Sequence, residues 1–387
     1  MHIEGNRQGT LVTNLPGIAQ YQSFNPSALD SVLPLNLGES GTALLARCSR
    51  KVGEMEGMSR FVPNADMYLT MYVRKEALLS SQIEGTQCTF DDVLDPSNNK
   101  ALSRDVADVI NYVNASEFAV AEMSRVPLCL RLFKGIHERL LSGVRGQDKH
   151  PGEVRTSQNW IGPAGCTIQD AAFVPPNVED MHRALGDLER FMNRDDIDPI
   201  IKAALSHYQF ETIHPFLDGN GRLGRLLITL SLMNDGVLSL PLFYPSYQLK
   251  LRRNEYYDRL TAVRVGGDYE GWVLFFCECM IAAAEDAANS LGKLVTLHEE
   301  SARAIRAGMG RTASNGLLLL EYLEGHPIVT PSMVQEALLV SRTTASGVVD
   351  DFVRLGVLRD VDASRRRYKT YAYEDYLSVL RAGGDPL

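Results

Sequence analysis

Residues 214–225 of this 387-residue chain read His-Pro-Phe-Leu-Asp-Gly-Asn-Gly-Arg-Leu-Gly-Arg and lie between two helical sequence patterns. Pro215 prevents the first helix from continuing smoothly, and the Gly219–Gly221 triplet allows a tight turn. The backbone N–H groups of such a turn converge at the start of the next helix, expected near Arg222, where they can bind an anion. The segment therefore predicts an anion site, suited to phosphate, between two helices.

The charged side chains of this segment fit the same interpretation. Arg222 and Arg225 stand three residues apart in the first helical turn, where the helix dipole disfavours positive charge unless an anion is bound. Asp218 can hold Mg²⁺ shared with phosphate oxygens, since Mg²⁺ usually takes one or two carboxylates. His214 is the titratable group of the segment that can act as a base near neutral pH. We therefore expect a polyphosphate, a magnesium ion and a base at one place.

The segment resembles the signature of the Fic family, HxFx(D/E)GNGRxxR. Every specified position matches, namely His214, Phe216, Asp218, Gly219, Asn220, Gly221, Arg222 and Arg225. The flanking segments Pro151–Gly162 and Ala172–Pro176 are similar to those that frame the target-docking flap of the family. In that resemblance the flap residues are Trp160, Ile161, Gly162 and Phe173.

The resemblance implies transfer of AMP from ATP to a Ser, Thr or Tyr hydroxyl of a target protein. His214 would deprotonate the hydroxyl, Asp218 would hold Mg²⁺, and the two arginines would neutralise the outer phosphates. Other relatives use the same loop with different nucleotide donors. The implied ATP contacts are Glu84, Gly219, Asn220, Gly221, Arg222, Leu223, Gly224, Arg225, Tyr256 and Tyr257, the two tyrosines near the adenine.

A second motif, Ser80-Ser-Gln-Ile-Glu-Gly85, is similar to the inhibitory helix (S/T)xxxE(G/N) of Fic proteins whose inhibitory helix precedes the catalytic loop. In that resemblance Ser80, Glu84 and Gly85 are inhibitory, and Glu84 pairs with Arg225 to exclude ATP from its productive pose. A plain helix end with a glycine stop is the alternative, since glycine after the last turn is common. Some relatives use this glutamate to position water for AMP removal, so both roles stay open.

Apolar residues at helical spacing predict a mainly α fold. We expect a helical Fic core with a β-hairpin flap within Gly152–Pro176, divided as an N-terminal segment with the inhibitory helix (1–110), the catalytic core (111–300) and a C-terminal domain (301–387). The stretch before Gly41 is expected to be an extended lead. The helices are predicted at Arg104–Met123, Leu128–Leu141, Val178–Phe191, Pro199–Ile213, Arg253–Val263 and Trp272–Leu297, with another ending near Glu84.

Beyond Gly310, three short helical patterns precede two strand-like segments, which is the outline of a winged helix-turn-helix. The helices are predicted at Ala313–Leu323, Pro331–Leu338 and Thr343–Leu355. Possible nucleic-acid contacts are Arg342, Arg365, Arg366 and Arg367. Winged helices also mediate protein contacts and dimers, so DNA binding stays open. The alternative function is a DNA-binding regulator that uses the Fic body as a nucleotide sensor.

Composition restricts the remaining possibilities. With 45% hydrophobic and 22% charged residues the chain is typical of globular proteins, and its net charge of −9 argues against bulk coating of nucleic acid or anionic membranes. The six cysteines show no zinc-binding spacing, and the apolar stretch Leu226–Met233 is too short to span a bilayer. We expect a cytoplasmic protein without membrane contact. Self-modification and a homodimer are expected from the resemblance.

Overall fold

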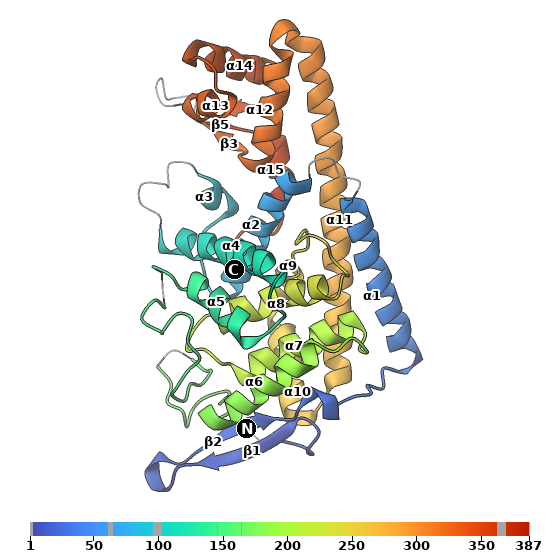
Figure 1. Ribbon diagram of the computed structural model, residues 1–387, viewed down its shortest axis with the longest axis vertical. Coiled ribbons are helices and arrows are strands. Elements are labelled where there is room, and N and C mark those ends of the chain that lie inside the picture. Colours follow the sequence, from blue (N-terminus) through green and yellow to red (C-terminus); the bar gives the residue numbers. More distant parts are fainter. Residues whose placement is uncertain are drawn as a thin grey trace.

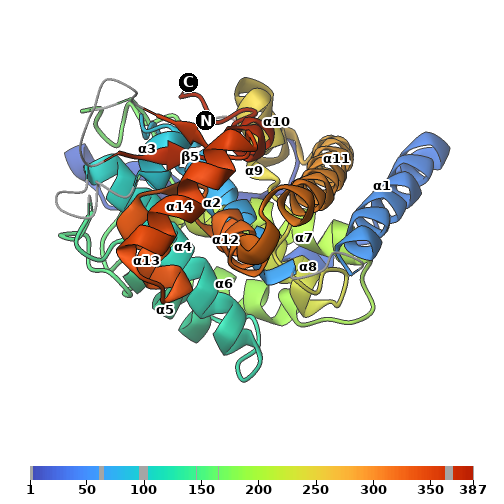
Figure 2. The ribbon, with the colours of Figure 1, turned by 90° about the horizontal axis from the view of Figure 1, so that it is seen from above.

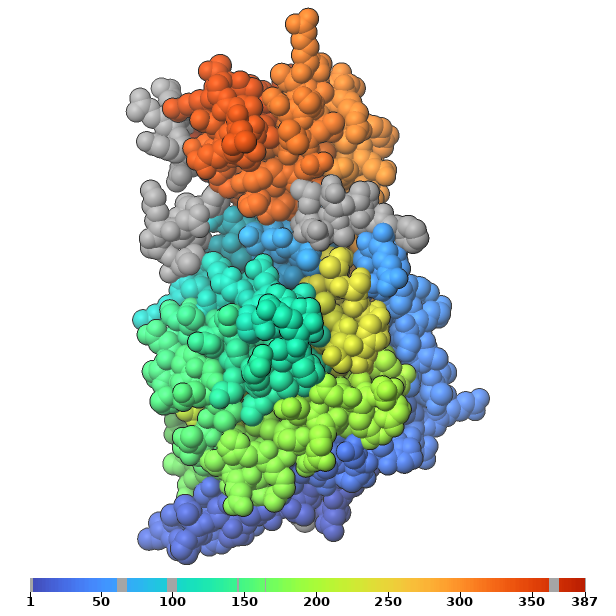
Figure 3. Space-filling view, viewed as in Figure 1, coloured from blue at the N-terminus to red at the C-terminus, as the bar shows by residue number. Residues whose placement is uncertain are grey.

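The computed structural model describes residues 3–60, 65–95, 103–144, 146–163, 165–361 and 369–386. The fold is mainly helical with small antiparallel sheets, as predicted. Figures 1 and 3 show an elongated molecule. In Figure 1 the long helix α11 (Tyr269–Gly308) runs beside a helical body and reaches a smaller unit at one end. Within the described ranges, no helix combines the length and the apolar character that a bilayer crossing requires.

The helical body confirms most of the predicted elements, two of them, α4 and α7, residue for residue. Its helices are α1 (Gly38–Ser59), α2 (Ala65–Ile83), α3 (Phe90–Leu94), α4 (Arg104–Met123), α5 (Leu130–Leu140), α6 (Val178–Met192), α7 (Pro199–Ile213), α8 (Asn220–Asn234), α9 (Ser246–Leu251) and α10 (Arg253–Gly266).

Helices α7 and α8 form the centre of the body and are buried on nearly every side. The buried set includes polar side chains as well as apolar ones, among them His207 and Glu211 on α7 and Arg222 and Arg225 on α8. Asp198 caps α7 by accepting hydrogen bonds from the N–H groups of Ile200 and Ile201, and Pro199 occupies the first helical position. These signals fix where α7 begins, and hence where its far end delivers His214.

The end predicted for α11 at Leu297 was wrong, because the helix continues to Gly308. Its last turns bury Ala302 and Ile305 against the C-terminal unit, and Ile305 packs closely on Gly316. Tertiary packing therefore extends a helix whose own sequence pattern weakens. Trp272 and the Phe275–Phe276 pair are buried, as predicted for core residues.

Two strands missed by the sequence analysis form a ribbon at the other end of the molecule (Figure 1). Strands β1 (Gly9–Asn14) and β2 (Tyr21–Pro26) pair antiparallel, where only an extended lead was expected. The Phe24 N–H donates to the Val174 carbonyl (2.9 Å), and the rings of Phe24 and Phe173 lie 6.0 Å apart. The ribbon thus packs on the flap segment, a long-range contact that local periodicity does not reveal.

The C-terminal unit contains α12 (Ala313–Gly325), β3 (Ile328–Val329), α13 (Pro331–Leu338), α14 (Arg342–Arg354), β4 (Arg359–Asp360), β5 (Tyr371–Ala372) and α15 (Glu374–Leu380). Its antiparallel sheet has the order β3-β5-β4. Figure 2 shows α12, α13 and α14 grouped together. The three predicted helices are present, while β3 and α15 were not foreseen. Identification of the unit as a winged helix stays a prediction, as do the three proposed domain boundaries.

The predicted nucleic-acid contacts are mostly beyond what the structure describes. Arg365, Arg366 and Arg367 lie outside the described residues. Arg342 is exposed at the first residue of α14, directly after the capping residue Ser341. This placement gives DNA binding no support beyond the sequence.

Candidate active site

The loop from His214 to Gly219 links α7 to α8 and forms the floor of the site. His214 ends α7 in a left-handed conformation (φ 49°), and Gly219 caps α8 with φ 74°. The first backbone bond inside α8 runs from the Leu223 N–H to the Gly219 carbonyl (3.1 Å). The N–H groups of Asn220, Gly221 and Arg222 therefore precede the helical ladder, as an anion site requires. The helix begins at Asn220, two residues before the predicted start.

The side chain of Asn220 shapes this loop and is buried. Its Oδ1 accepts from the Phe216 N–H (2.9 Å), and its Nδ2 donates to the Phe216 carbonyl (2.8 Å). The Phe216 ring in turn stacks on the His137 ring, with centroids 3.9 Å apart. Because both ends of the Asn220 amide are engaged, its backbone N–H is the group left to serve a phosphate.

His214 lies at the edge of a small pocket of about 250 Å³, together with Glu84, Asp218 and the residues of the anion turn. Its Nδ1 is 3.3 Å from the Glu211 carbonyl. A carbonyl only accepts, so Nδ1 carries the proton and Nε2 carries the lone pair. Burial and the positive charges of Arg264 and Arg155 lower the pKa of His214 to about 4. The imidazole is therefore neutral, and basic at Nε2, near neutral pH.

The carbonyl groups around His214 are held by Arg155, which the sequence analysis did not single out. Its guanidinium donates to the carbonyls of His214 (3.0 Å) and Pro176 (2.5 Å). The backbone N–H of Arg155 donates to the Pro215 carbonyl (2.9 Å). Asn159 donates to the carbonyls of His214 (3.2 Å) and Phe216 (2.9 Å). Both residues lie in the Pro151–Gly162 segment. The resemblance of this segment to the family was the sequence signal that could have identified them.

His137 holds the other side of the loop and was also missed. Gly152 N–H donates to His137 Nδ1 (2.9 Å), so the ring donates from Nε2 to the Asp218 carbonyl (3.0 Å). Burial lowers the pKa of His137 to about 4. A neutral ring with this tautomer therefore positions the main chain at Asp218.

Asp218 places one carboxylate at the pocket, where the sequence predicts a magnesium ion shared with phosphate oxygens. Its Oδ1 accepts from the Gly219 N–H (2.6 Å), and its side chain borders the pocket. Among the described residues, no group of three His, Cys, Asp or Glu side chains could enclose a metal ion. One carboxylate fits Mg²⁺ that is completed by phosphate oxygens and water, since Mg²⁺ favours oxygen donors and keeps several waters.

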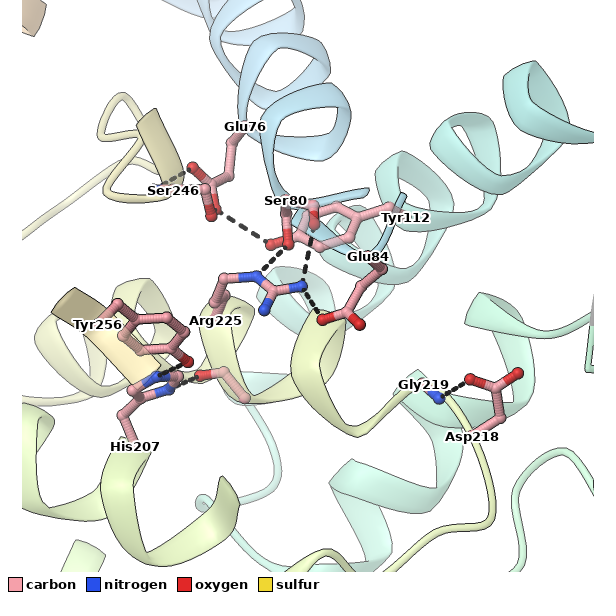
Figure 4. A network of polar contacts seen from close by, with 11 residues as sticks. Glu76, Ser80, Glu84, Tyr112, His207, Asp218, Gly219, Arg225, Ser246 and Tyr256 are labelled. Carbon is pink, nitrogen blue, oxygen red and sulfur yellow. Dashed lines mark hydrogen bonds and ion pairs between the residues drawn. The ribbon is translucent and has the colours of Figure 1, made fainter. Parts of the chain in front are cut away.

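Arg225 is almost fully buried and is held by the end of α2 (Figure 4). Its Nε donates to Ser80 Oγ (2.9 Å), and its Nη2 donates to the Ser80 carbonyl (2.9 Å) and to Glu84 Oε1 (2.8 Å). Partial removal from water would by itself raise the pKa of Glu84, but the charges of Arg225 and Arg222 outweigh this and lower that pKa. The predicted pairing of Glu84 with Arg225 is thus present.

Glu84 and Gly85 form the turn that follows α2, with Gly85 at φ 95°. The Glu84 carboxylate lies directly against the first turn of α8, because a Cβ built on Gly221 would be 2.1 Å from Glu84 Oε1. A carboxylate in this place occupies part of the space in front of the anion turn. The glycine at 221 is therefore what permits Glu84 to approach.

Arg222 is paired differently from Arg225. It is buried, and its Nη1 lies 3.5 Å from Asp108 Oδ1 of α4. Leu223 and Gly224, which follow it, are buried within α8. The predicted contacts of these residues with ATP stay predictions.

Glu211 is a further buried acid that the sequence analysis did not identify. It lies one turn before His214 on α7, and a Cβ built on Gly224 would be 2.4 Å from its Oε1. No donor among the described residues forms a hydrogen bond with that oxygen. Burial, opposed by the charge of Arg225, raises the pKa of Glu211 to about 7. The glycine at position 224 of α8 was the sequence signal for this close approach of Glu211 to α8.

Tyr256 and His207 form a buried pair behind the site (Figure 4). His207 Nε2 lies 2.9 Å from the Tyr256 hydroxyl, and Nδ1 lies 2.7 Å from the Gly224 carbonyl. Both ring nitrogens of His207 thus have protein partners, as predicted for a structural residue and not for a metal ligand. Tyr257 is 39% exposed. A contact of either tyrosine with adenine stays a prediction.

The flap contains one antiparallel bridge where a hairpin was predicted. Ile161 N–H donates to the Phe173 carbonyl (2.8 Å), and Phe173 N–H donates to the Ile161 carbonyl (3.0 Å). Trp160 is 42% exposed and donates to the Cys166 carbonyl, while Gly162 lies against Cys166. Arg264, another buried residue missed from sequence, lies 4.0 Å above the Phe173 ring and so joins the flap to α10.

The comparisons with known proteins agree with this geometry. Residues 42–121 match the Fic/DOC family N-terminal domain, and residues 127–232 match the Fic/DOC family. The fold and site thus define a protein with a Fic N-terminal domain, which bears the Glu84 turn, followed by a Fic domain, which bears the His214 loop. The chain belongs to the Fic family.

The curated relatives are named protein adenylyltransferase Fic. That of Drosophila yakuba is 27% identical over 237 residues, which is 59% of this chain and 43% of the relative. That of Drosophila ananassae is 31% identical over 185 residues, 47% of this chain and 32% of the relative. The matched region is therefore less than half the length of these relatives.

Solved structures share the fold. A Fic family protein from Desulfovibrio desulfuricans has a TM-score of 0.53 at 20% identity and covers 88% of this chain and 97% of its own. A Fic domain containing signaling protein from Bacteroides thetaiotaomicron has a TM-score of 0.50 at 18% identity, over 64% of this chain and 97% of its own. At these identities the likeness concerns the fold alone.

Proposed function

We propose that this protein is an adenylyltransferase that transfers AMP from ATP to a Ser, Thr or Tyr hydroxyl of a target protein, and to itself. The observation that carries the proposal is the shared pocket of His214 and the N–H groups at the start of α8. A neutral base and an anion site then lie within one small space. The naming of the curated relatives supports the same activity.

In the proposed reaction His214 Nε2 takes the proton of the target hydroxyl. The hydroxyl oxygen forms a bond to the α-phosphorus of ATP, and the bond from that phosphorus to the oxygen bridging to the β-phosphate breaks. AMP stays on the target, and pyrophosphate leaves with the displaced electron pair. The N–H groups of the anion turn face the negative charge that builds on the phosphate oxygens.

Asp218 would hold Mg²⁺, which supplies charge neutralisation on the phosphate oxygens when bound. Arg222 and Arg225 add fixed positive charge at the start of α8. Leu223 and Gly224 are the ATP contacts that the resemblance implies after Arg222, and Tyr256 and Tyr257 are the residues proposed near adenine. The flap residues Trp160, Ile161, Gly162 and Phe173 would receive an extended target segment by strand addition.

Glu84 is proposed to inhibit this reaction by competing with the terminal phosphate for Arg225. Charge-assisted pairs of this kind are among the stronger hydrogen bonds, so carboxylate and phosphate are matched competitors. Ser80 holds the guanidinium, and Gly85 forms the turn that presents Glu84. Removal of AMP by a water that Glu84 positions is a second proposed role of the same carboxylate. A homodimer and the DNA-binding regulator remain predictions from sequence.

Labelled ATP tests the proposed reaction. The Glu84→Gly protein, with Mg²⁺, should incorporate label from the α-phosphate and none from the γ-phosphate, and Glu84→Gly/His214→Ala should incorporate neither. Incorporation from the γ-phosphate would show phosphoryl transfer instead. The nucleotide sensor would be favoured if the protein binds ATP without incorporating label and if its regulatory effect survives His214→Ala.

A further inference from the structure

The segment 381–385, which follows α15, contacts the end of α2 that leads into the Glu84 turn. Gln82, two residues before Glu84, is buried and donates from Nε2 to the Gly384 carbonyl (2.8 Å) and to the Cys88 carbonyl (2.9 Å). Figure 1 shows the C-terminal end of the chain returning to the helical body, away from α13 and α14. The segment 381–385 thus contacts the inhibitory motif itself.

Lys250 of α9 completes this contact. Its buried ammonium donates to Gln82 Oε1 (2.6 Å), to the Gly383 carbonyl (2.9 Å) and to the Asp385 carbonyl. One cation therefore bridges the end of α2 and the segment 381–385. Buried charges of this kind are retained only where several acceptors surround them.

The segment 381–385 fits closely against its surroundings. Arg381 Nε donates to Asp91 Oδ1 (2.8 Å), and Gly384 packs on Phe90 and Leu78. Gly383 has φ 77°, and a Cβ added there would lie 2.0 Å from the Tyr247 ring. The backbone at this position therefore requires glycine, both for its conformation and for the approach to Tyr247.

The same C-terminal unit also holds the other end of α2. The Tyr68 hydroxyl donates to Glu324 Oε1 (3.0 Å) on α12, and the rings of Tyr68 and Tyr376 are stacked at 6.5 Å. Tyr376 donates to the Glu324 carbonyl (2.8 Å). Because the C-terminal unit contacts both ends of α2, a movement of this unit would be transmitted to the whole inhibitory helix.

The Glu84 turn depends on the residues that this unit holds. The N–H groups of Glu84 and Thr86 donate to the Ser81 carbonyl (3.0 and 3.2 Å), and the Gly85 N–H donates to the Gln82 carbonyl (3.0 Å). The Glu84 carboxylate is therefore placed on Arg225 by a turn whose base is Ser81 and Gln82.

We propose that the segment 381–385, clamped to Gln82 through Lys250, is a latch that keeps Glu84 on Arg225. A partner that displaces the C-terminal unit or this segment would release the Glu84 turn and permit ATP to bind productively. The regulatory consequence rests on the proposed function, whereas the mechanical coupling does not. In this proposal the C-terminal unit is the part of the chain at which a signal relieves inhibition by Glu84.

Two full-length variants open the latch without changing Glu84, Arg225 or His214. Gly383→Ala places a methyl group into the Tyr247 ring and strains a positive φ, which displaces the segment 381–385. Lys250→Met removes the bridging ammonium and keeps a side chain of similar length. Gly356→Ala is the matched control, because Gly356 has the same φ of 77° with no atom within 4 Å of its added Cβ.

Hydrogen exchange at single amides is the first measurement. Both latch variants should raise exchange at Glu84, Gly85 and Thr86 by roughly tenfold, the loss expected for about one net hydrogen bond, and Gly356→Ala should leave it unchanged. Exchange of the Gly384 N–H, which donates to the Arg381 carbonyl (2.8 Å), reports whether the segment itself moved. Unchanged exchange at residues 84–86 in both latch variants would overturn the proposal.

AMP incorporation is the second measurement. Each latch variant should incorporate AMP roughly five- to tenfold faster than wild type, with no further gain when combined with Glu84→Gly. Equal gains in both backgrounds would contradict a latch that acts through Glu84. Faster exchange with no incorporation in any variant, Glu84→Gly included, would retain the coupling and reject the proposed transfer reaction.

Discussion

The Glu84 carboxylate and the Arg225 guanidinium are 2.8 Å apart, yet their environments differ. The Arg225 side chain is 1% exposed, while that of Glu84 is 37% exposed. Arg225 also keeps two bonds to Ser80, so departure of Glu84 would not leave the guanidinium without a partner. The pair is therefore built to open by movement of Glu84, with Arg225 staying in place.

The contacts of Ser80 with Arg225 can be tested against its neighbour. Ser80→Ala removes the hydroxyl that accepts from Arg225 Nε, and should lower the free energy of unfolding by about 1.5–3 kcal/mol, as for hydrogen bonds to charged groups. Ser81→Ala is the matched control, because the buried Ser81 hydroxyl forms no hydrogen bond with any described residue. Denaturant unfolding measures both. Equal losses would contradict a special role for Ser80.

The raised pKa of Glu211 predicts a pH-dependent stability difference. In the unfolded chain this acid ionises near its ordinary pKa of 4.5, and in the folded protein near 7. Between these values the folded state holds the extra proton, so Glu211 lowers stability as pH rises. Glu211→Gln should therefore gain stability relative to wild type as pH rises from about 5 to 8.

Thermal unfolding of both proteins across this pH range measures the difference. Arg225, Arg264 and Glu84 are the charged groups acting on Glu211, and Glu84 raises its pKa. Adding Glu84→Gly to both proteins should shift the pH dependence to lower pH. A stability difference that does not vary with pH would contradict a buried, protonated Glu211.

The lowered pKa of His214 predicts the acid limb of the reaction. Because burial holds this pKa near 4, the imidazole stays neutral and able to accept a proton well below the ordinary pKa of 6.5. Initial rates of AMP incorporation by Glu84→Gly should thus change little between about pH 8 and pH 6. A rate that halves near pH 6.5 would show an ordinary histidine exposed to water.

The sequence predicted the parts of the site that depend on local signals. Apolar residues at helical spacing located α7, and the glycines of the loop located the anion turn. The contact of Glu84 with Arg225 followed from two matched motifs, although 141 residues separate them. Family resemblance, and not periodicity, supplied that pairing.

The groups that hold the loop could not be found in this way. His137 reaches Asp218 across 81 residues, and a lone histidine on a helix gives no signal of its partner. Arg155 satisfies carbonyl groups, which carry no side-chain code. The ribbon β1–β2 and the continuation of α11 likewise depend on surfaces formed only in the folded protein, so local propensity was overridden by packing.

The central claim is a nucleotide transfer that His214 carries out and Glu84 restrains. Intact mass measurement of the purified chain after incubation with ATP and Mg²⁺ tests it most directly, on wild type, Glu84→Gly and Glu84→Gly/His214→Ala. We predict an added AMP on Glu84→Gly, much less on wild type, and none on the double variant. Equal AMP addition to all three proteins, or none to Glu84→Gly while it binds ATP and stays folded, would contradict the account.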